Sequence, residues 1–152
     1  MIIVVCKDDP ALLDVARDQA DNDPAEFGAF YEVFKDQIDP LQQGENLFVS
    51  AHGAYKGDDG NPVIGDSAKD FFVNAVEFYE NLDGGSIFPD GYEGKVYISA
   101  CESSNNPRGA FSFAEVFKAQ IQGKYPKTKV FGQKGSVGLN IPRSDARGWD
   151  QA

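Results

Sequence analysis

The chain has 152 residues, of which 41% are hydrophobic and 25% charged, and these proportions predict one folded domain spanning residues 1–152. A net charge of −10 at pH 7 argues against nucleic acid and anionic membranes as partners, and favours a basic peptide or protein surface. The sequence contains neither a signal-peptide pattern nor an apolar run long enough to span a membrane, so we expect a cytoplasmic protein unless a signal-independent route exports it.

The first half of the chain alternates apolar runs with helical patterns. Residues 2–6 form a β-branched run typical of a strand buried on both faces. A weak helical pattern follows over residues 9–20. A stronger one, with aromatic residues at helical spacing, predicts a helix over residues 23–39. Residues 47–51 predict the second strand.

The second half continues the alternation. Residues 55–64 indicate a small hairpin, and a capping-box pattern at Ser67 predicts a helix that continues to Leu82. A strand at 95–100, a second capping box at Ser112 and a strand at 129–131 complete the order. This order predicts an α/β fold, a three-layer sandwich whose mostly parallel sheet has at least four strands. The polar tail from Asn140 is expected to be loosely held.

Two residues able to do chemistry together end separate predicted strands. His52, the only histidine, follows the second strand, and Cys101 follows the third. The carboxyl ends of parallel strands meet at one edge of a sheet, so neighbouring strands would bring this pair together. An imidazole can take the proton of a thiol during attack and return it to a leaving amine. The backbone N–H groups of Gly53 and Cys101 could then hold an oxyanion.

The sequence resembles the caspase-like (clan CD) cysteine peptidases in the two blocks that carry these residues. One is the apolar block 47–51 followed by His52-Gly53, and the other is the block 96–100 followed by Cys101. The pattern is most similar to CHAT domains and to the self-cleaving protease domains of bacterial toxins. The resemblance implies a caspase-like fold, with Cys101 as nucleophile, His52 as general base and acid, and Gly53 in the oxyanion hole. It also implies an endopeptidase that cleaves itself or a protein partner, as in a bacterial effector. No metal or other cofactor is expected, since one histidine and two separated cysteines offer no paired-ligand spacing for zinc.

Other interpretations of the same residues remain open. A lone cysteine at a strand end is commonly a small buried hydrophobic residue. The domain could also be a catalytically silent protein-binding module, or a small-ligand domain that uses the same sheet edge. The segment from Cys101 to Arg108 is one residue too long for a phosphate-binding loop of the C-x5-R type. The acidic stretch 58–61 lacks the ligand spacing of a calcium loop. The loop of residues 133–138 is expected to lie at the same edge as Cys101.

Overall fold

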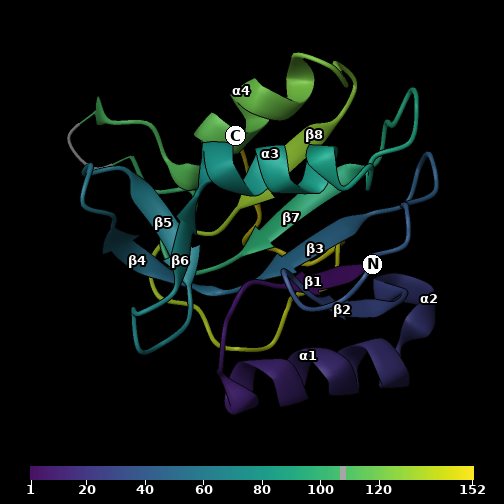
Figure 1. The fold of residues 1–152 in the computed structure, drawn as a ribbon, viewed down its shortest axis with the longest axis horizontal. Coiled ribbons are helices and arrows are strands. Elements are labelled where there is room, and N and C mark those ends of the chain that lie inside the picture. The colour runs from purple at the N-terminus through teal and green to yellow at the C-terminus, as the bar shows by residue number, and fades with distance from the viewer. Residues whose placement is uncertain (107–108) are drawn as a thin grey trace.

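The centre of the protein is a six-stranded sheet. The computed structural model describes residues 1–106 and 109–152, and its strands have the order β2-β1-β3-β7-β8-β9 (Figure 1). All neighbouring strands run parallel except β8 and β9. The predicted α/β class with a mostly parallel sheet is therefore confirmed. The strands are β1 (Ile2–Val4), β2 (Phe30–Glu32), β3 (Leu47–Ser50), β7 (Lys95–Ser99), β8 (Lys129–Gly132) and β9 (Asp150–Gln151).

Helices cover both faces of this sheet, which gives three layers. Helices α1 (Pro10–Asn22) and α2 (Pro24–Phe27) lie on one face, and α3 (Ala75–Gly84) and α4 (Phe113–Gln122) lie on the other (Figure 1). The α1 side packs on alternate strand residues such as Phe48 and Tyr97, while the α3 side packs on the residues between them. No helix in residues 1–106 or 109–152 is long and apolar enough to cross a membrane.

The predicted hairpin is present and belongs to a second, smaller sheet. Strands β4 (His52–Lys56), β5 (Pro62–Gly65) and β6 (Phe72–Asn74) pair antiparallel. The third of these strands was not predicted, because residues 67–82 were assigned to one helix. The helix actually begins after Asn74, which forms a capping box with Glu77. Ser67 instead donates its backbone N–H to Asp9, so it does not start a helix.

The helix predicted over residues 23–39 is wrong. Helix α2 ends after one turn at Gly28, whose φ of 65° is accessible to glycine and ends the helical path. The chain then becomes the edge strand β2, paired in parallel with β1. Aromatic residues suit a strand as well as a helix. Residues 30–32 therefore form a strand because they pair with β1, although their spacing also fits a helix.

The segment from Asn140, expected to be loosely held, is packed against the α1 side. Ile141 is buried, and the side chain of Gln19 bonds both its N–H and its carbonyl oxygen. The ring of Trp149 lies 5.0 Å from that of Tyr97. The chain then ends in β9 against β8. The prediction of a loose segment was wrong because the segment is mostly polar and only a few of its residues make buried contacts. Arg108, considered for a phosphate loop, lies outside the described residues.

Candidate functional site

The backbones of His52 and Cys101 lie side by side at the carboxyl edge of the sheet. Strands β3 and β7 are neighbours, and Ser50 opposite Ser99 is the last pair of their ladder, completed by the bond from the N–H of Ala51 to the carbonyl of Ser99 at 3.2 Å. His52 and Cys101 each lie two residues beyond this pair. Side chains alternate along a strand, so this pair shares the α1 face with Phe48 and Tyr97.

The imidazole of His52 is held by a buried carboxylate. Its Nε2 lies 3.1 Å from Oδ2 of Asp9, and the two side chains are 29% and 6% exposed. Asp9 is the N-cap of α1, so the helix that covers this face positions the carboxylate. Because Nε2 faces an acceptor, the ring carries its proton there and presents Nδ1 as the basic nitrogen. That is the protonation pattern a general base requires.

Asp9 itself is fixed by backbone donors. Leu12 donates its N–H to Oδ1 at 3.2 Å, and Ser67 donates its N–H to Oδ2 at 3.1 Å. Burial favours the neutral acid, but the hydrogen bonds from Ser67 and Leu12 and the nearby His52 outweigh it, so the pKa of Asp9 is held below its ordinary value. The carboxylate is therefore ionised at neutral pH and can stabilise an imidazolium.

The sulfur of Cys101 contacts the main chain of Val137. The N–H of Val137 donates to Sγ at 3.3 Å, and the thiol lies 3.6 Å from the carbonyl oxygen of the same residue. The predicted loop of residues 133–138 does lie at this edge. Cys101 is half-buried, so the contact leaves part of the residue accessible.

A set of hydrogen bonds fixes the loop to the turn that follows Cys101. Glu102 donates its N–H to the carbonyl of Gly135 at 2.9 Å, and Ser104 donates to that of Gln133 at 3.0 Å. Gln133 in turn donates its N–H to Oγ of Ser103 at 2.9 Å. These bonds come from separate strand ends, so the position of Cys101 is set by the sheet and not by one flexible loop.

Gly53 is required for close packing against Cys101. A Cβ atom at this position would lie 2.3 Å from the carbonyl oxygen of Cys101 and 3.2 Å from its nitrogen. The space that the missing side chain leaves is therefore filled by the Cys101 peptide, and a substrate would have to approach the N–H of Gly53 from another side. Within residues 1–106 and 109–152, no backbone carbonyl accepts the N–H of Cys101.

Backbone strain is concentrated at the same place. Five non-glycine residues of the described chain have positive φ, and two of them directly follow the candidate site residues: Ala54 (φ 65°) after Gly53, and Glu102 (φ 57°) after Cys101. The ladder between β4 and β5 is also irregular between His52 and Tyr55. Left-handed backbone is unfavourable for alanine, and such strain tends to persist where it positions functional groups.

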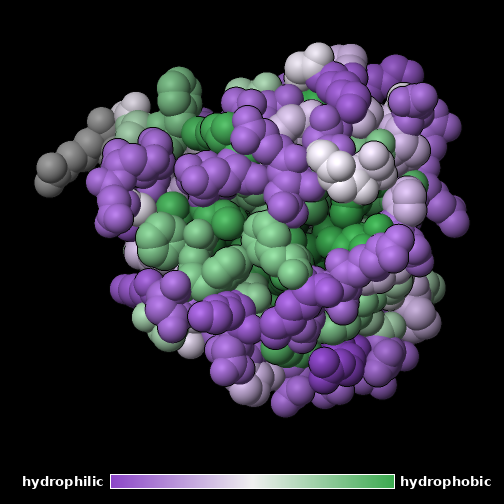
Figure 2. Space-filling view, viewed as in Figure 1, coloured by the Kyte–Doolittle hydropathy of each residue, from purple (hydrophilic) through white to green (hydrophobic). Residues whose placement is uncertain are grey.

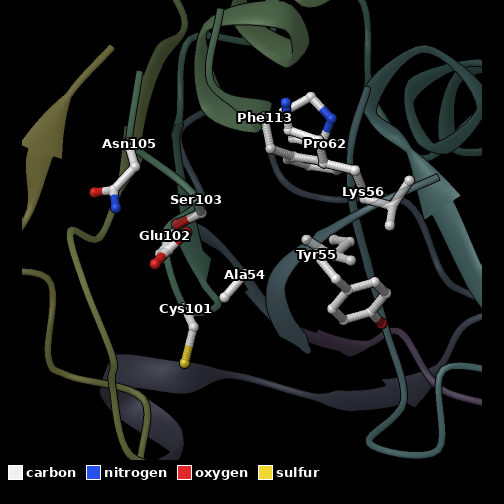
Figure 3. Close-up of a pocket in the computed structure, with 11 residues that line it drawn as sticks. Ala54, Tyr55, Lys56, Pro62, Cys101, Glu102, Ser103, Asn105 and Phe113 are labelled. Atoms are coloured by element: carbon white, nitrogen blue, oxygen red, sulfur yellow. The ribbon is translucent and has the colours of Figure 1, made fainter. Parts of the chain in front are cut away.

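A small cavity of about 170 Å³ borders Cys101. Tyr55, Lys56, Pro62 and Phe113 are among the residues that line it. Figure 3 shows the side chain of Cys101 extending away from Phe113 and Pro62. The sulfur contacts the main chain of Val137, which is not among the residues that line the cavity.

Two features of this site were missed from the sequence. Asp9 is an ordinary N-cap in sequence, and the contact with His52 spans 43 positions, so no local pattern reveals it. The contact of Val137 with Cys101 is equally remote. The sequence contains one indication of where Asp9 lies. Asp9 follows the first strand, so it lies near the same edge of the sheet as His52 and Cys101.

The remaining candidate ligands form no metal site. In the described part of the chain, no group of three or more His, Cys, Asp or Glu side chains is arranged to hold a metal ion. In the acidic stretch, Asp59 accepts hydrogen bonds from the N–H and the side-chain amide of Asn61, which is the geometry of a self-capped turn.

Comparison with known proteins gives no relative. No family model, curated protein or solved structure matches the chain.

Proposed function

We propose that the chain is a caspase-like cysteine endopeptidase in which Cys101 is the nucleophile and His52 the general base and acid. The observation that carries the proposal is the shared position of the two residues, each two residues beyond the last β3–β7 pair at one sheet edge, with His52 bonded to buried Asp9. Ionised Asp9 keeps the proton on Nε2, so Nδ1 is free to receive a proton from the thiol.

The first half of the reaction forms a thioester. Nδ1 of His52 takes the Cys101 proton while the sulfur attacks the carbonyl carbon of the scissile peptide. The C–O double bond opens to an oxyanion, which the N–H groups of Cys101 and Gly53 would hold. The imidazolium, stabilised by Asp9, gives its proton to the amide nitrogen. The C–N bond then breaks, and the amine leaves.

The second half restores the enzyme. Nδ1 of His52 takes a proton from water as the water oxygen attacks the thioester carbon. Collapse of this intermediate breaks the C–S bond and releases a carboxylic acid, and the sulfur regains a proton from the imidazolium. No metal or redox partner is needed to balance either half.

A binding module without catalysis is the second candidate, and one observation favours it. The sulfur already contacts both the N–H and the carbonyl of Val137. A peptidase of this geometry has to move the Val137 main chain away from the sulfur before a substrate carbonyl can reach it.

The test compares wild type with Cys101→Ala and His52→Ala on a denatured proteome digest and on the chain itself, with new termini identified by mass spectrometry under reducing conditions. We expect wild type to generate new termini that neither variant generates. Equal cleavage by wild type and Cys101→Ala, or no cleavage by wild type, would contradict the proposal.

A matched control uses the other cysteine. Cys6 is buried at the end of β1, so Cys6→Ala keeps the active dyad and should cleave at the same sites as wild type. Loss of cleavage in both cysteine variants would indicate general damage to the fold, which thermal unfolding of each variant would reveal.

A further inference from the structure

A groove separate from the candidate site lies between residues 34–40 and the end of α3. Its volume is about 660 Å³. Phe34, Ile38 and Ile87 form its apolar part, and Asp36, Asp39 and Glu80 are its acidic members. Figure 2 shows hydrophobic side chains gathered across the middle of the face on which α3 lies, with hydrophilic residues around them.

Phe34 is presented to solvent at a conformational cost. Its φ is 65°, a region that bulky side chains rarely occupy, and its side chain is 50% exposed. The ring makes an edge contact with Phe71 at 5.7 Å between centroids. Phe72, which follows, is also among the large hydrophobic residues left exposed. The chain therefore holds Phe34 in an unfavourable backbone conformation and buries only half of its side chain. A partner that covered the ring would bury the exposed half.

The charged side chains that line the groove are all acidic. No lysine or arginine is among its lining residues. Asp36 accepts the N–H of Glu32 at 2.7 Å, and Asp39 accepts the hydroxyl of Tyr31 at 3.0 Å. Within the described residues, neither they nor Glu80 forms an ion pair. Neutral donors orient two of these carboxylates, and their charge remains available.

We propose that this groove binds a segment of a partner protein in which an apolar side chain is flanked by lysine or arginine. The apolar side chain would pack on Phe34 and Ile38, and the cations would pair with Asp39 and Glu80. A second copy of this chain fits poorly, because its net charge of −10 would add like charge to the acidic rim. This binding is independent of the proposed peptidase activity.

The test selects ligands from a randomised linear peptide library displayed on phage, with the immobilised chain as target. Synthetic versions of the selected peptides are then titrated by fluorescence anisotropy. We expect enrichment of Lys and Arg beside Leu, Ile or Phe, and weaker binding at higher salt. Phe34→Ser, and separately the pair Asp39→Lys and Glu80→Lys, should each weaken binding about tenfold or more.

Two substitutions outside the groove are the matched controls. Phe111 is 71% exposed, so Phe111→Ser removes a ring that is more accessible than that of Phe34, and Asp18→Lys reverses an exposed charge on α1. Neither should change the affinity of the selected peptides, and Cys101→Ala should also retain it. The proposal is overturned if no peptides are enriched, if the enriched peptides are acidic, or if the controls weaken binding as much as the groove variants do. Self-association abolished by Phe34→Ser would also overturn it, because the occupant would then be a second copy.

Discussion

The two cysteines of this chain end two parallel strands of one sheet, yet their surroundings differ sharply. Cys6 follows β1 and is 2% exposed, and burial raises the pKa of its thiol to about 11. Cys101 follows β7, is half-buried, and has a backbone N–H donor on its sulfur. The turn and loop bonded to each other around Cys101 are the larger difference, because Cys6 too has a backbone hydrogen bond, with Asp9, whose effect burial outweighs.

The difference shows what makes a strand end a candidate site. Topology gives both cysteines the same starting position. Cys101 differs because strained and hydrogen-bonded neighbours surround it. Strand β3, which precedes His52, lies between β1 and β7 and therefore borders both cysteine-bearing strands. Cys6 lies beside the start of the loop that carries Asp9, yet it remains part of the apolar cluster under α1.

The largest expected contrast is in thiol reactivity. A pKa of about 11 leaves Cys6 with roughly a hundredfold less thiolate than an ordinary thiol with a pKa of ~8.5–9, and burial slows access further. We therefore expect iodoacetamide at pH 7.5 to label Cys101 at least about a hundredfold faster than Cys6 in the folded chain. Peptide mapping at timed intervals measures both rates at once, and comparable rates would remove the contrast.

The role of Asp9 gives the next largest effect. Asp9→Asn should lower kcat/KM for peptide cleavage on the order of 10²-fold, because an amide neither fixes the proton on Nε2 nor stabilises the imidazolium. Asparagine is also a good N-cap, so α1 should still form. Asp23, the N-cap of α2, gives the matched control Asp23→Asn. Unchanged activity in Asp9→Asn, or equal losses in both variants, would show that Asp9 does not position His52.

Close packing at Gly53 predicts a loss of stability. The Cβ atom of Gly53→Ala would lie 2.3 Å from the carbonyl oxygen of Cys101, so one of the two strand ends must shift, at a cost of about 2–4 kcal/mol in the free energy of unfolding. Gly44→Ala is the control, since no atom lies within 4 Å of its added Cβ. Urea unfolding of both variants tests this, and a Gly53→Ala chain as stable as wild type would contradict the packing described.

The smallest predicted effect is in the pH dependence of stability. Because the pKa of Asp9 is below its ordinary value in the folded chain, its ionised form stabilises the fold above about pH 4, and this stabilisation is lost as the pH falls through the folded pKa. The stability advantage of wild type over Asp9→Asn should therefore shrink between about pH 5 and pH 2. A constant difference across that range would show that Asp9 does not titrate with folding.

The sequence predicted the central strands well, because β1, β3 and β7 are continuous apolar runs that only a buried strand explains. It failed where tertiary pairing competed with local pattern. Phe30 and Tyr31 fit a helical spacing, but pairing with β1 made them a strand. Ser67 fits a capping box, but its N–H bonds Asp9 instead. For the site, the strand ends identified His52 and Cys101, whereas Asp9 and Val137 depend on contacts between distant segments.

The strand order also governs how this protein can be oxidised. Strand β3 lies between β1 and β7, so the ends that carry Cys6 and Cys101 are two strand spacings apart, about 9–10 Å. This exceeds the Cα separation that a disulfide can bridge. The chain's only other thiol therefore cannot resolve a sulfenic acid formed on Cys101. Oxidant would convert Cys101 to mixed disulfides, to dimers linked between chains, or to irreversible sulfinic acid.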